Sequence, residues 1–179
     1  IVKRHGGEIS VESEVGTGTT FTVTLPHARK KISGSEVASG SEVLPNLRIL
    51  VVEAIESVAA MLADGLRKLD QTVVTVLSGQ DAITLFKKSY VDAVICDLAM
   101  PEINGRQVTA AIKRICEERG SRKPVIVLLT GWGGRFDHEE SLPESGIDLI
   151  LEKPVEVRDM LRSIVKVHKK RSDSQPKEW

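Results

Sequence analysis

Short apolar runs recur along the chain from Leu47 onward, and segments with a helical spacing of apolar residues separate them. The runs lie at 49–52, 73–77, 93–96, 125–129 and 149–151. Strands buried on both faces of a parallel sheet show such near-continuous apolar runs, because neither face meets water. The pattern therefore predicts a parallel sheet with one strand for each run.

The segments between these runs have the periodicity of helices that pack one side against a sheet. Apolar residues fall on one helical face in 58–69, 108–115 and 157–165. Ser78 followed by Asp81 resembles a capping box and predicts a helix that runs to Ser89. The stretch 137–145 is poorly marked as a helix. Alternating strands and helices with right-handed crossovers predict an α/β fold, a doubly wound five-stranded parallel sheet in the flavodoxin-like order 2-1-3-4-5.

The first 26 residues follow a different pattern, in which polar and apolar residues alternate over 8–14 and 19–25. Gly16-Thr17-Gly18 lies between the two stretches, so the segment predicts a β-hairpin. A lone hairpin is marginally stable in water. We therefore interpret residues 1–26 as the remnant of another domain, in a chain that starts at Ile1 rather than Met and is expected to be a fragment.

The remaining segments complete the predicted domain organisation. Residues 27–46 carry Ser, Gly, Lys and Glu with few large apolar groups, which indicates a flexible linker. Residues 47–171 form the main domain, and 172–179 form a polar tail.

The composition of the chain limits the kinds of partner and the cellular location that we expect. The 25 basic and 25 acidic side chains cancel to a net charge of zero, so no nucleic-acid partner is expected. No apolar run approaches the roughly 20 residues that span a bilayer, which predicts a cytoplasmic chain without membrane contact. Cys96 and Cys116 lack metal-ligand spacing and are expected to be reduced and buried. The four histidines also lack ligand spacing and receive no role: His5, His27, His138 and His168.

Polar residues follow the predicted strands where the carboxyl ends of parallel strands meet. Glu53, Asp97, Thr130 and Lys153 each stand at or just past a strand end. Taken singly, each has a simpler interpretation as a loop cap or a surface charge. Together, a carboxylate nucleophile at Asp97 and an ammonium counter-charge at Lys153 suit phosphoryl transfer, because positive charge must neutralise the incoming oxygens.

The segment 94–105, with its Asp97, Met100-Pro101 and Gly105, resembles the phosphorylation-site signature of two-component receiver domains. Leu50-Val51-Val52-Glu53, Leu128-Leu129-Thr130-Gly131 and Glu152-Lys153-Pro154 extend the resemblance over Leu47 to Arg171. The resemblance implies that Asp97 is the phospho-acceptor, that Thr130 moves to bond the phosphoryl group, and that Lys153 precedes a cis proline and also bonds that group.

The chain departs from this family at the metal site. Receivers usually carry two adjacent acids after the first strand, and here the pair is Glu53-Ala54. The resemblance implies Mg²⁺ bound by Glu53, Asp97 and the backbone carbonyl of Ala99. Because the usual direct ligand is missing at Ala54, we expect Mg²⁺ to bind weakly. Glu56 is a poorer substitute, since it is expected to start a helix.

A second departure concerns the switch. Ile150 occupies the position that is usually Tyr or Phe, so aromatic rotation cannot report the phosphorylated state. Trp132, two residues past Thr130, is an alternative reporter, or it only covers its loop.

Residues 1–26, with Gly16-Thr17-Gly18-Thr19 and Phe21-Thr22-Val23-Thr24-Leu25-Pro26, resemble the end of a histidine-kinase ATP-binding domain. The resemblance implies the carboxyl end of a hybrid histidine kinase, whose kinase core donates phosphate and whose receiver passes it to a histidine phosphotransfer protein. This chain lacks the ATP site and the phospho-accepting histidine of that family, so no kinase activity by itself is expected. A homodimer stays open, because 137–145 leaves any pairing surface unmarked.

Three functions compete on these residues. The first is a phosphorelay receiver, which Asp97, Thr130 and Lys153 favour. The second is a degenerate pseudo-receiver that regulates the kinase by docking without phosphorylation, which Ala54 favours. The third is an unrelated flavodoxin-like enzyme, which would need a glycine-rich first loop that 53–57 does not contain.

Overall fold

The computed structural model describes residues 2–5, 7–26, 44–131 and 146–173. The chain divides into two compact units, Ile1–Ser41 and Glu42–Trp179. Several predictions fall outside the described residues and stay predictions. They concern most of the linker, the end of the tail, the stretch 137–145, Trp132, His27 and His138.

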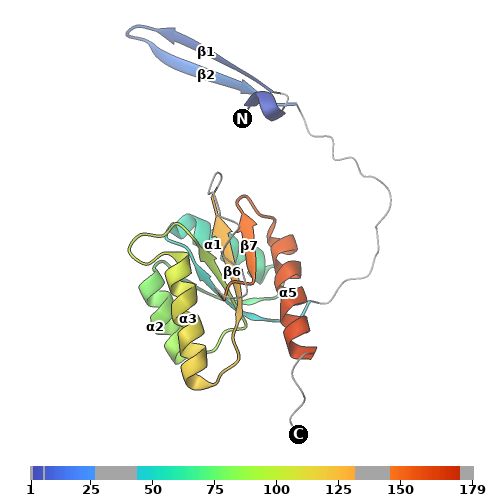
Figure 1. Ribbon diagram of the computed structural model, residues 1–179. Helices are drawn as coiled ribbons and strands as arrows, with labels where there is room; N and C mark the ends of the chain where they lie inside the picture. Colours follow the sequence, from blue (N-terminus) through green and yellow to red (C-terminus); the bar gives the residue numbers. More distant parts are fainter. Residues whose placement is uncertain (1, 6, 27–43, 132–145, 174–179) are drawn as a thin grey trace, which may run out of the picture. The chain divides into compact units, whose positions relative to one another are not determined.

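The first unit contains a short 3₁₀ helix, η1 (Val2–His5), and an antiparallel hairpin of β1 (Glu8–Glu14) and β2 (Gly18–Thr24) (Figure 1). The predicted hairpin is confirmed. Gly16 in the turn and Gly18 at the start of β2 have φ values of 86° and 124°, a region that side chains rarely adopt. One face is apolar and exposed, because cross-strand pairing brings four side chains together there: Ile9, Val11, Phe21 and Val23.

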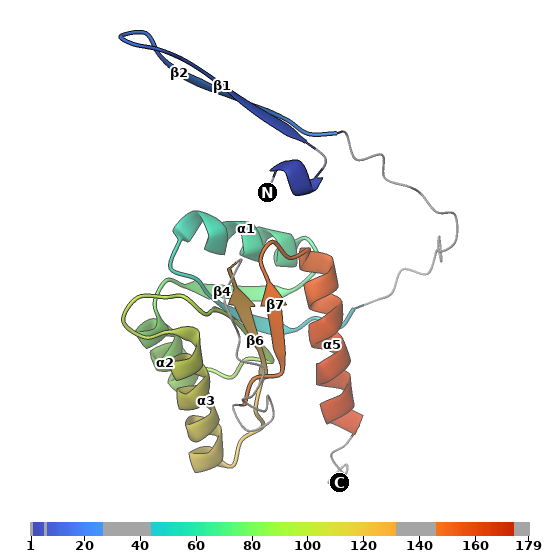
Figure 2. The same cartoon turned by 45° about the horizontal axis from the view of Figure 1, so that its top comes forward.

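The second unit is a parallel sheet with the strand order β4-β3-β5-β6-β7 (Figures 1 and 2). The strands are β3 (Arg48–Val52), β4 (Thr72–Val76), β5 (Ala93–Asp97), β6 (Val125–Thr130) and β7 (Leu149–Glu152). Counted along this unit, the order is 2-1-3-4-5, so the predicted topology is confirmed. The strand predicted at 73–77 starts and ends one residue earlier.

Helices cover both faces of this sheet. They are α1 (Glu56–Arg67), α2 (Gly79–Lys88), α3 (Gly105–Arg119) and α5 (Val157–Asp173). One buried cluster joins the sheet to α2 and α3, and a second joins it to α1 and α5. Successive residues of β3 alternate between them, since Leu50 enters the first cluster and Val51 the second. This alternation explains why the central strands contain uninterrupted apolar runs, as at 49–52 in β3.

Local sequence sets where the helices start. Ser78 Oγ accepts a hydrogen bond from the backbone N–H of Asp81, which confirms the predicted cap of α2. A full capping box that was not predicted starts α3, where the side chains of Asn104 and Gln107 each accept a hydrogen bond from the other's backbone N–H. Cys96 and Cys116 are free and buried, as expected. None of the helices that the structure describes is long and apolar enough to cross a bilayer.

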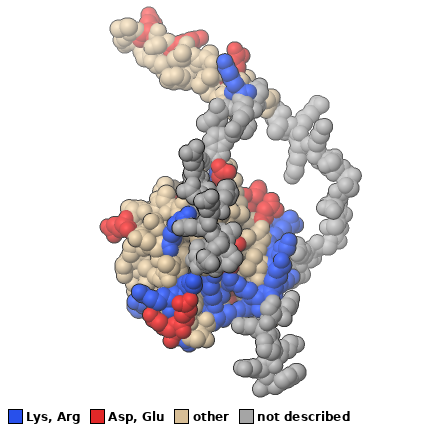
Figure 3. Space-filling view, in the orientation of Figure 1, with Lys and Arg blue, Asp and Glu red and all other residues tan. Residues whose placement is uncertain are grey.

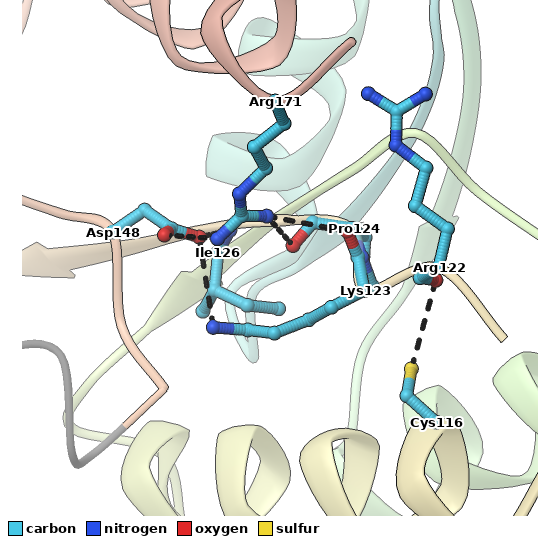
Figure 4. A network of polar contacts seen from close by, with 7 residues as sticks. All are labelled: Cys116, Arg122, Lys123, Pro124, Ile126, Asp148 and Arg171. Atoms are coloured by element: carbon cyan, nitrogen blue, oxygen red, sulfur yellow. Dashed lines mark hydrogen bonds and ion pairs between the residues drawn. The ribbon is translucent and has the colours of Figure 1, made fainter. Parts of the chain in front are cut away.

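Charged side chains close the edge of the sheet where β6 and β7 begin (Figure 4). Arg171, near the end of α5, donates hydrogen bonds to the carbonyl oxygens of Lys123 and Pro124 and pairs with Asp148. The other carboxylate oxygen of Asp148 accepts from the backbone N–H of Ile126 at 2.8 Å. These contacts attach the end of α5 to the start of both strands.

Although the chain has no net charge, basic and acidic side chains are unevenly distributed over this unit. Basic side chains gather over the outer side of α5 (Figure 3). The exposed basic residues of this helix are Arg158, Arg162, Lys166, Lys169 and Lys170. Acidic side chains, by contrast, meet at the carboxyl ends of the strands, where the candidate site lies.

Candidate functional site

The carboxyl ends of four parallel strands bring the predicted site residues to one edge of the sheet. Asp97 is the last residue of β5 and Thr130 the last of β6. Glu53 follows β3 directly, and Lys153 follows β7. The predicted convergence of these four residues on one edge is confirmed, because the strands are parallel and their carboxyl ends meet there.

Lys153 lies between the two carboxylates. Its Nζ is 2.7 Å from Glu53 Oε2 and 3.1 Å from Asp97 Oδ1. Its backbone N–H donates to the carbonyl oxygen of Thr130 at 2.7 Å, which fixes the residue against the end of β6. The peptide bond from Lys153 to Pro154 is cis, as the resemblance implied.

The three side chains in contact at this site differ in how far they are buried. The side chain of Lys153 is 30% exposed, that of Asp97 12% and that of Glu53 only 2%. Burial lowers the pKa of Lys153, but its hydrogen bonds to Glu53 and Asp97 outweigh burial and leave the pKa above its ordinary value. Lys153 therefore stays a positively charged ammonium beside the carboxylate of Asp97.

Both side-chain oxygens of Glu53 are bonded within the protein. Oε1 accepts a hydrogen bond from the backbone N–H of Ile55 at 3.2 Å, and Oε2 accepts from Lys153. The backbone N–H of Glu53 donates to the carbonyl oxygen of Val76, which ties this residue to the neighbouring strand. Glu53 is thus a buried carboxylate with fixed partners.

Cys96 precedes Asp97 and could compete with it as a nucleophile. Burial, and then the charges of Asp97 and Glu53, raise the pKa of the Cys96 thiol to about 12. A thiol rather than a thiolate is present at neutral pH, and a thiol is a poor nucleophile. Cys96 is therefore a poorer candidate nucleophile at this edge than the carboxylate of Asp97.

The loop after β5 closes tightly on Asp97. Leu98 donates its backbone N–H to the carbonyl oxygen of Leu129, and Gly105 donates to the carbonyl oxygen of Leu98. A Cβ on Gly105 would lie 2.6 Å from the backbone oxygen of Asp97, closer than real Cβ contacts come. The glycine of the phosphorylation-site motif is thus explained by the close approach of α3 to the Asp97 backbone.

The other predicted residues occupy the same edge. Thr130 is buried, and Ala99 is exposed in the loop two residues past Asp97. Ala54 is partly buried and packs against the cluster between the sheet and helices α2 and α3. Glu56 is the first residue of α1, as expected.

The residues present fit only a sparse metal site. Among the described residues, no group of three His, Cys, Asp or Glu side chains could hold a metal ion. Asp97 offers a carboxylate and Ala99 a backbone carbonyl, while both oxygens of Glu53 already have donors. Mg²⁺ keeps several waters in proteins and needs only one or two carboxylates. The donor set therefore fits an Mg²⁺ ion that keeps water as most of its ligands.

Sequence comparison identifies the receiver domain of response regulators over residues 49–165. The aerobic respiration control sensor protein ArcB of Escherichia coli strain K12 is 32% identical over 93% of this chain, and the virulence sensor protein BvgS of Bordetella bronchiseptica is 30% identical over 90%. The matches cover 21% and 14% of these relatives, so the chain spans about a fifth or less of their length.

Solved receiver domains share the fold. One is the receiver domain of a Saccharomyces cerevisiae response regulator, crystallised with a histidine phosphotransfer protein. It aligns at a TM-score of 0.63 and 23% identity, over 72% of this chain and 92% of that receiver chain. Another, from a Pseudomonas aeruginosa sensor histidine kinase, has magnesium in its active-site cleft and aligns at a TM-score of 0.55 and 23% identity over 68% and 99%. At these identities the likeness establishes the fold alone.

Proposed function

Because the chain belongs to the response regulator receiver domain family, we propose that it acts in a two-component phosphorelay by accepting a phosphoryl group on Asp97. One observation carries this proposal. The ammonium of Lys153 lies 3.1 Å from the Asp97 carboxylate, at the end of a strand whose loop leaves that carboxylate partly exposed. A partly exposed carboxylate with a fixed cation beside it suits attack on phosphorus.

The proposed step transfers the group from a phosphohistidine. A carboxylate oxygen of Asp97 attacks the phosphorus, the new O–P bond forms, and the N–P bond to the donor imidazole breaks. Lys153 neutralises charge on the transferred oxygens as they approach. Thr130, at the end of the adjacent strand β6, then donates a hydrogen bond from its hydroxyl to a phosphoryl oxygen.

Weakly bound Mg²⁺ is part of the same proposal. When bound, the ion would supply further positive charge for the phosphoryl oxygens. Asp97 and the Ala99 carbonyl would hold it with water, and Ala54 cannot contribute the carboxylate found in other receivers. Glu53, the third ligand that the resemblance implies, has both carboxylate oxygens bonded within the protein.

The proposed phosphodonor is the histidine kinase core of a longer hybrid kinase, and the proposed recipient is a histidine phosphotransfer protein. The match to ArcB supports this origin, because it covers 93% of the chain and so extends beyond the receiver at 49–165 into the amino-terminal segment. The complex of a structural neighbour with a histidine phosphotransfer protein supports the recipient. A kinase core needs ATP, which favours a cytoplasmic location. The proposed organisation is a kinase remnant at 1–26, a linker at 27–46, the receiver at 47–171 and a tail at 172–179.

Ala54 leaves one competing function, a pseudo-receiver that docks without phosphorylation. The two functions differ in whether Asp97 is modified. Intact-mass analysis after incubation with phosphoramidate, at rising Mg²⁺ concentration, separates them. We expect the wild type to gain the mass of one phosphoryl group and Asp97→Asn to gain none. A wild-type mass that stays unchanged at every Mg²⁺ concentration would leave the pseudo-receiver as the function.

A further inference from the structure

We infer that Glu53 is a positioning residue for Lys153 rather than a ligand of the metal, an inference that rests on the proposed phosphorylation of Asp97. Its starting point is the pair of contacts that Lys153 Nζ makes. The contact with Glu53 is the shorter, at 2.7 Å against 3.1 Å to Asp97. The reacting carboxylate is thus the second partner of an ammonium that Glu53 already holds.

The position of Glu53 explains why it can hold Lys153 in place. Glu53 is buried, and the backbone N–H of Ile55 fixes its other oxygen. Its own backbone N–H is bonded to the adjacent strand β4. The backbone is thus held in place, and the carboxylate cannot swing away from Lys153 without losing both of its hydrogen bonds. By comparison, the side chain of Asp97 is more exposed and nearer to an incoming reactant.

Release of Glu53 to a metal would be unfavourable for a physical reason. A buried charge is tolerated when it is paired and hydrogen-bonded, and it is costly when its partner leaves. If Glu53 turned to Mg²⁺, Lys153 would lose its closest partner, and Mg²⁺ would have to give up water that it releases reluctantly. The sparse donor set around Ala54 offers the ion little in exchange.

The position of the Lys153 ammonium also determines how much it can assist the proposed reaction. A lysine side chain is long and flexible, and its charge helps phosphoryl transfer only when it is held where the oxygens will arrive. Glu53 supplies that constraint before the donor binds. The arrangement is preorganised, because the ammonium is already within 3.1 Å of Asp97.

The first test uses the unphosphorylated protein, and its deciding comparison is the wild type with and without Mg²⁺. Lysine-selective ¹⁵N NMR detects an ammonium whose protons exchange slowly because they are held in buried hydrogen bonds. We expect a Lys153 Nζ signal that persists when the protein is saturated with Mg²⁺. Glu53→Gln should remove the signal, and Glu56→Gln, which changes an acid at the start of α1, should keep it. Loss of the wild-type signal on adding Mg²⁺ would overturn the inference.

The second test is a double-mutant cycle for phosphorylation at saturating Mg²⁺. We expect Glu53→Gln to slow the reaction with phosphoramidate by about 100-fold, and Glu53→Gln combined with Lys153→Met to be no slower than Lys153→Met alone. A double variant that is clearly slower than Lys153→Met would show that Glu53 acts apart from Lys153 and would refute the inference. If no variant and no wild type is phosphorylated, the proposed function fails, while the NMR test still decides the contact between Glu53 and Lys153.

Discussion

Arg171 and Asp148 form an ion pair at the edge of the sheet opposite Asp97, and Arg171 also donates to the carbonyl oxygens of Lys123 and Pro124. One guanidinium thus joins the last turns of α5 to the starts of β6 and β7 (Figure 4). Because Arg presents several donors in a rigid fork, it can satisfy a carboxylate and two carbonyls together. Lysine could not reproduce this set of contacts.

Arg171→Ala is therefore expected to destabilise the protein by about 2 kcal/mol, since it leaves a partly buried carboxylate and two carbonyls without this donor. Urea unfolding measures the change. Arg114→Ala is the matched control, because Arg114 pairs with Glu118 on the exposed surface of α3, and its loss should cost about 0.5 kcal/mol or less. Equal effects of the two substitutions would contradict this account.

Gly105→Ala is expected to destabilise the loop that carries Asp97. The added Cβ would lie 2.6 Å from the Asp97 backbone oxygen and 3.0 Å from a methyl group of Leu128. Overpacking of this kind costs about 1 to 3 kcal/mol, and the shift of Asp97 should also slow its phosphorylation. Gly131→Ala provides the comparison for stability, because nothing lies within 4 Å of its added Cβ. Thermal unfolding that gave the same midpoint for Gly105→Ala and the wild type would argue against the close approach.

Ala54→Asp is expected to tighten Mg²⁺ binding by about tenfold or more, because it restores a carboxylate beside Asp97. Isothermal titration calorimetry measures the affinity. Ala54→Asn has nearly the same shape without the charge, so it should bind Mg²⁺ much less tightly than Ala54→Asp. If wild type and Ala54→Asp bound Mg²⁺ equally, the missing acid would not explain a weak site.

His168 should make the protein less stable on the acid side of neutrality. Burial and the positive charge of Arg122, with a smaller contribution from Arg171, outweigh Asp92 and hold the pKa of His168 below its ordinary value of 6.5. The folded state therefore binds the proton less readily than the unfolded state. The penalty is absent well above pH 6.5, and it grows as the pH falls through 6.5 toward the folded pKa.

The measurement is urea unfolding of wild type and His168→Gln from about pH 7.5 down to about pH 5.5. We expect the wild type to lose more stability over this range than the variant. Parallel curves for the two proteins would mean that His168 titrates alike in the folded and unfolded states.

The core strands could be predicted because burial on both faces leaves an uninterrupted apolar run. β6 is the clearest case, since every residue from Val125 to Thr130 is buried. β4 was predicted one residue late because it is an edge strand, where Thr72 and Val74 are exposed and Leu77 lies beyond its end. Apolar patterning marks an edge less sharply than a centre.

The site could be predicted in part. Parallel strands bring their carboxyl ends to one edge, so the meeting of Asp97 with Lys153 followed from order and motif. The hydrogen bonds to both carboxylate oxygens of Glu53 could not be predicted, because one of them depends on the direction of the Ile55 backbone N–H after β3. Arg171 was missed for a similar reason. Its partners lie more than twenty positions away, and no local pattern connects them.

Among the strands that the structure describes, β7 is the last in the sheet order and has a strand neighbour on one side only. Its four residues cover about 13 Å, and a charged residue stands at each end. Asp148 before it is bound to Arg171, and Lys153 after it is bound to Glu53. Slippage of the strand by one residue would break both contacts together. Hydrogen bonds to one neighbouring strand alone would allow this outer strand to slide. The two end contacts therefore fix its register.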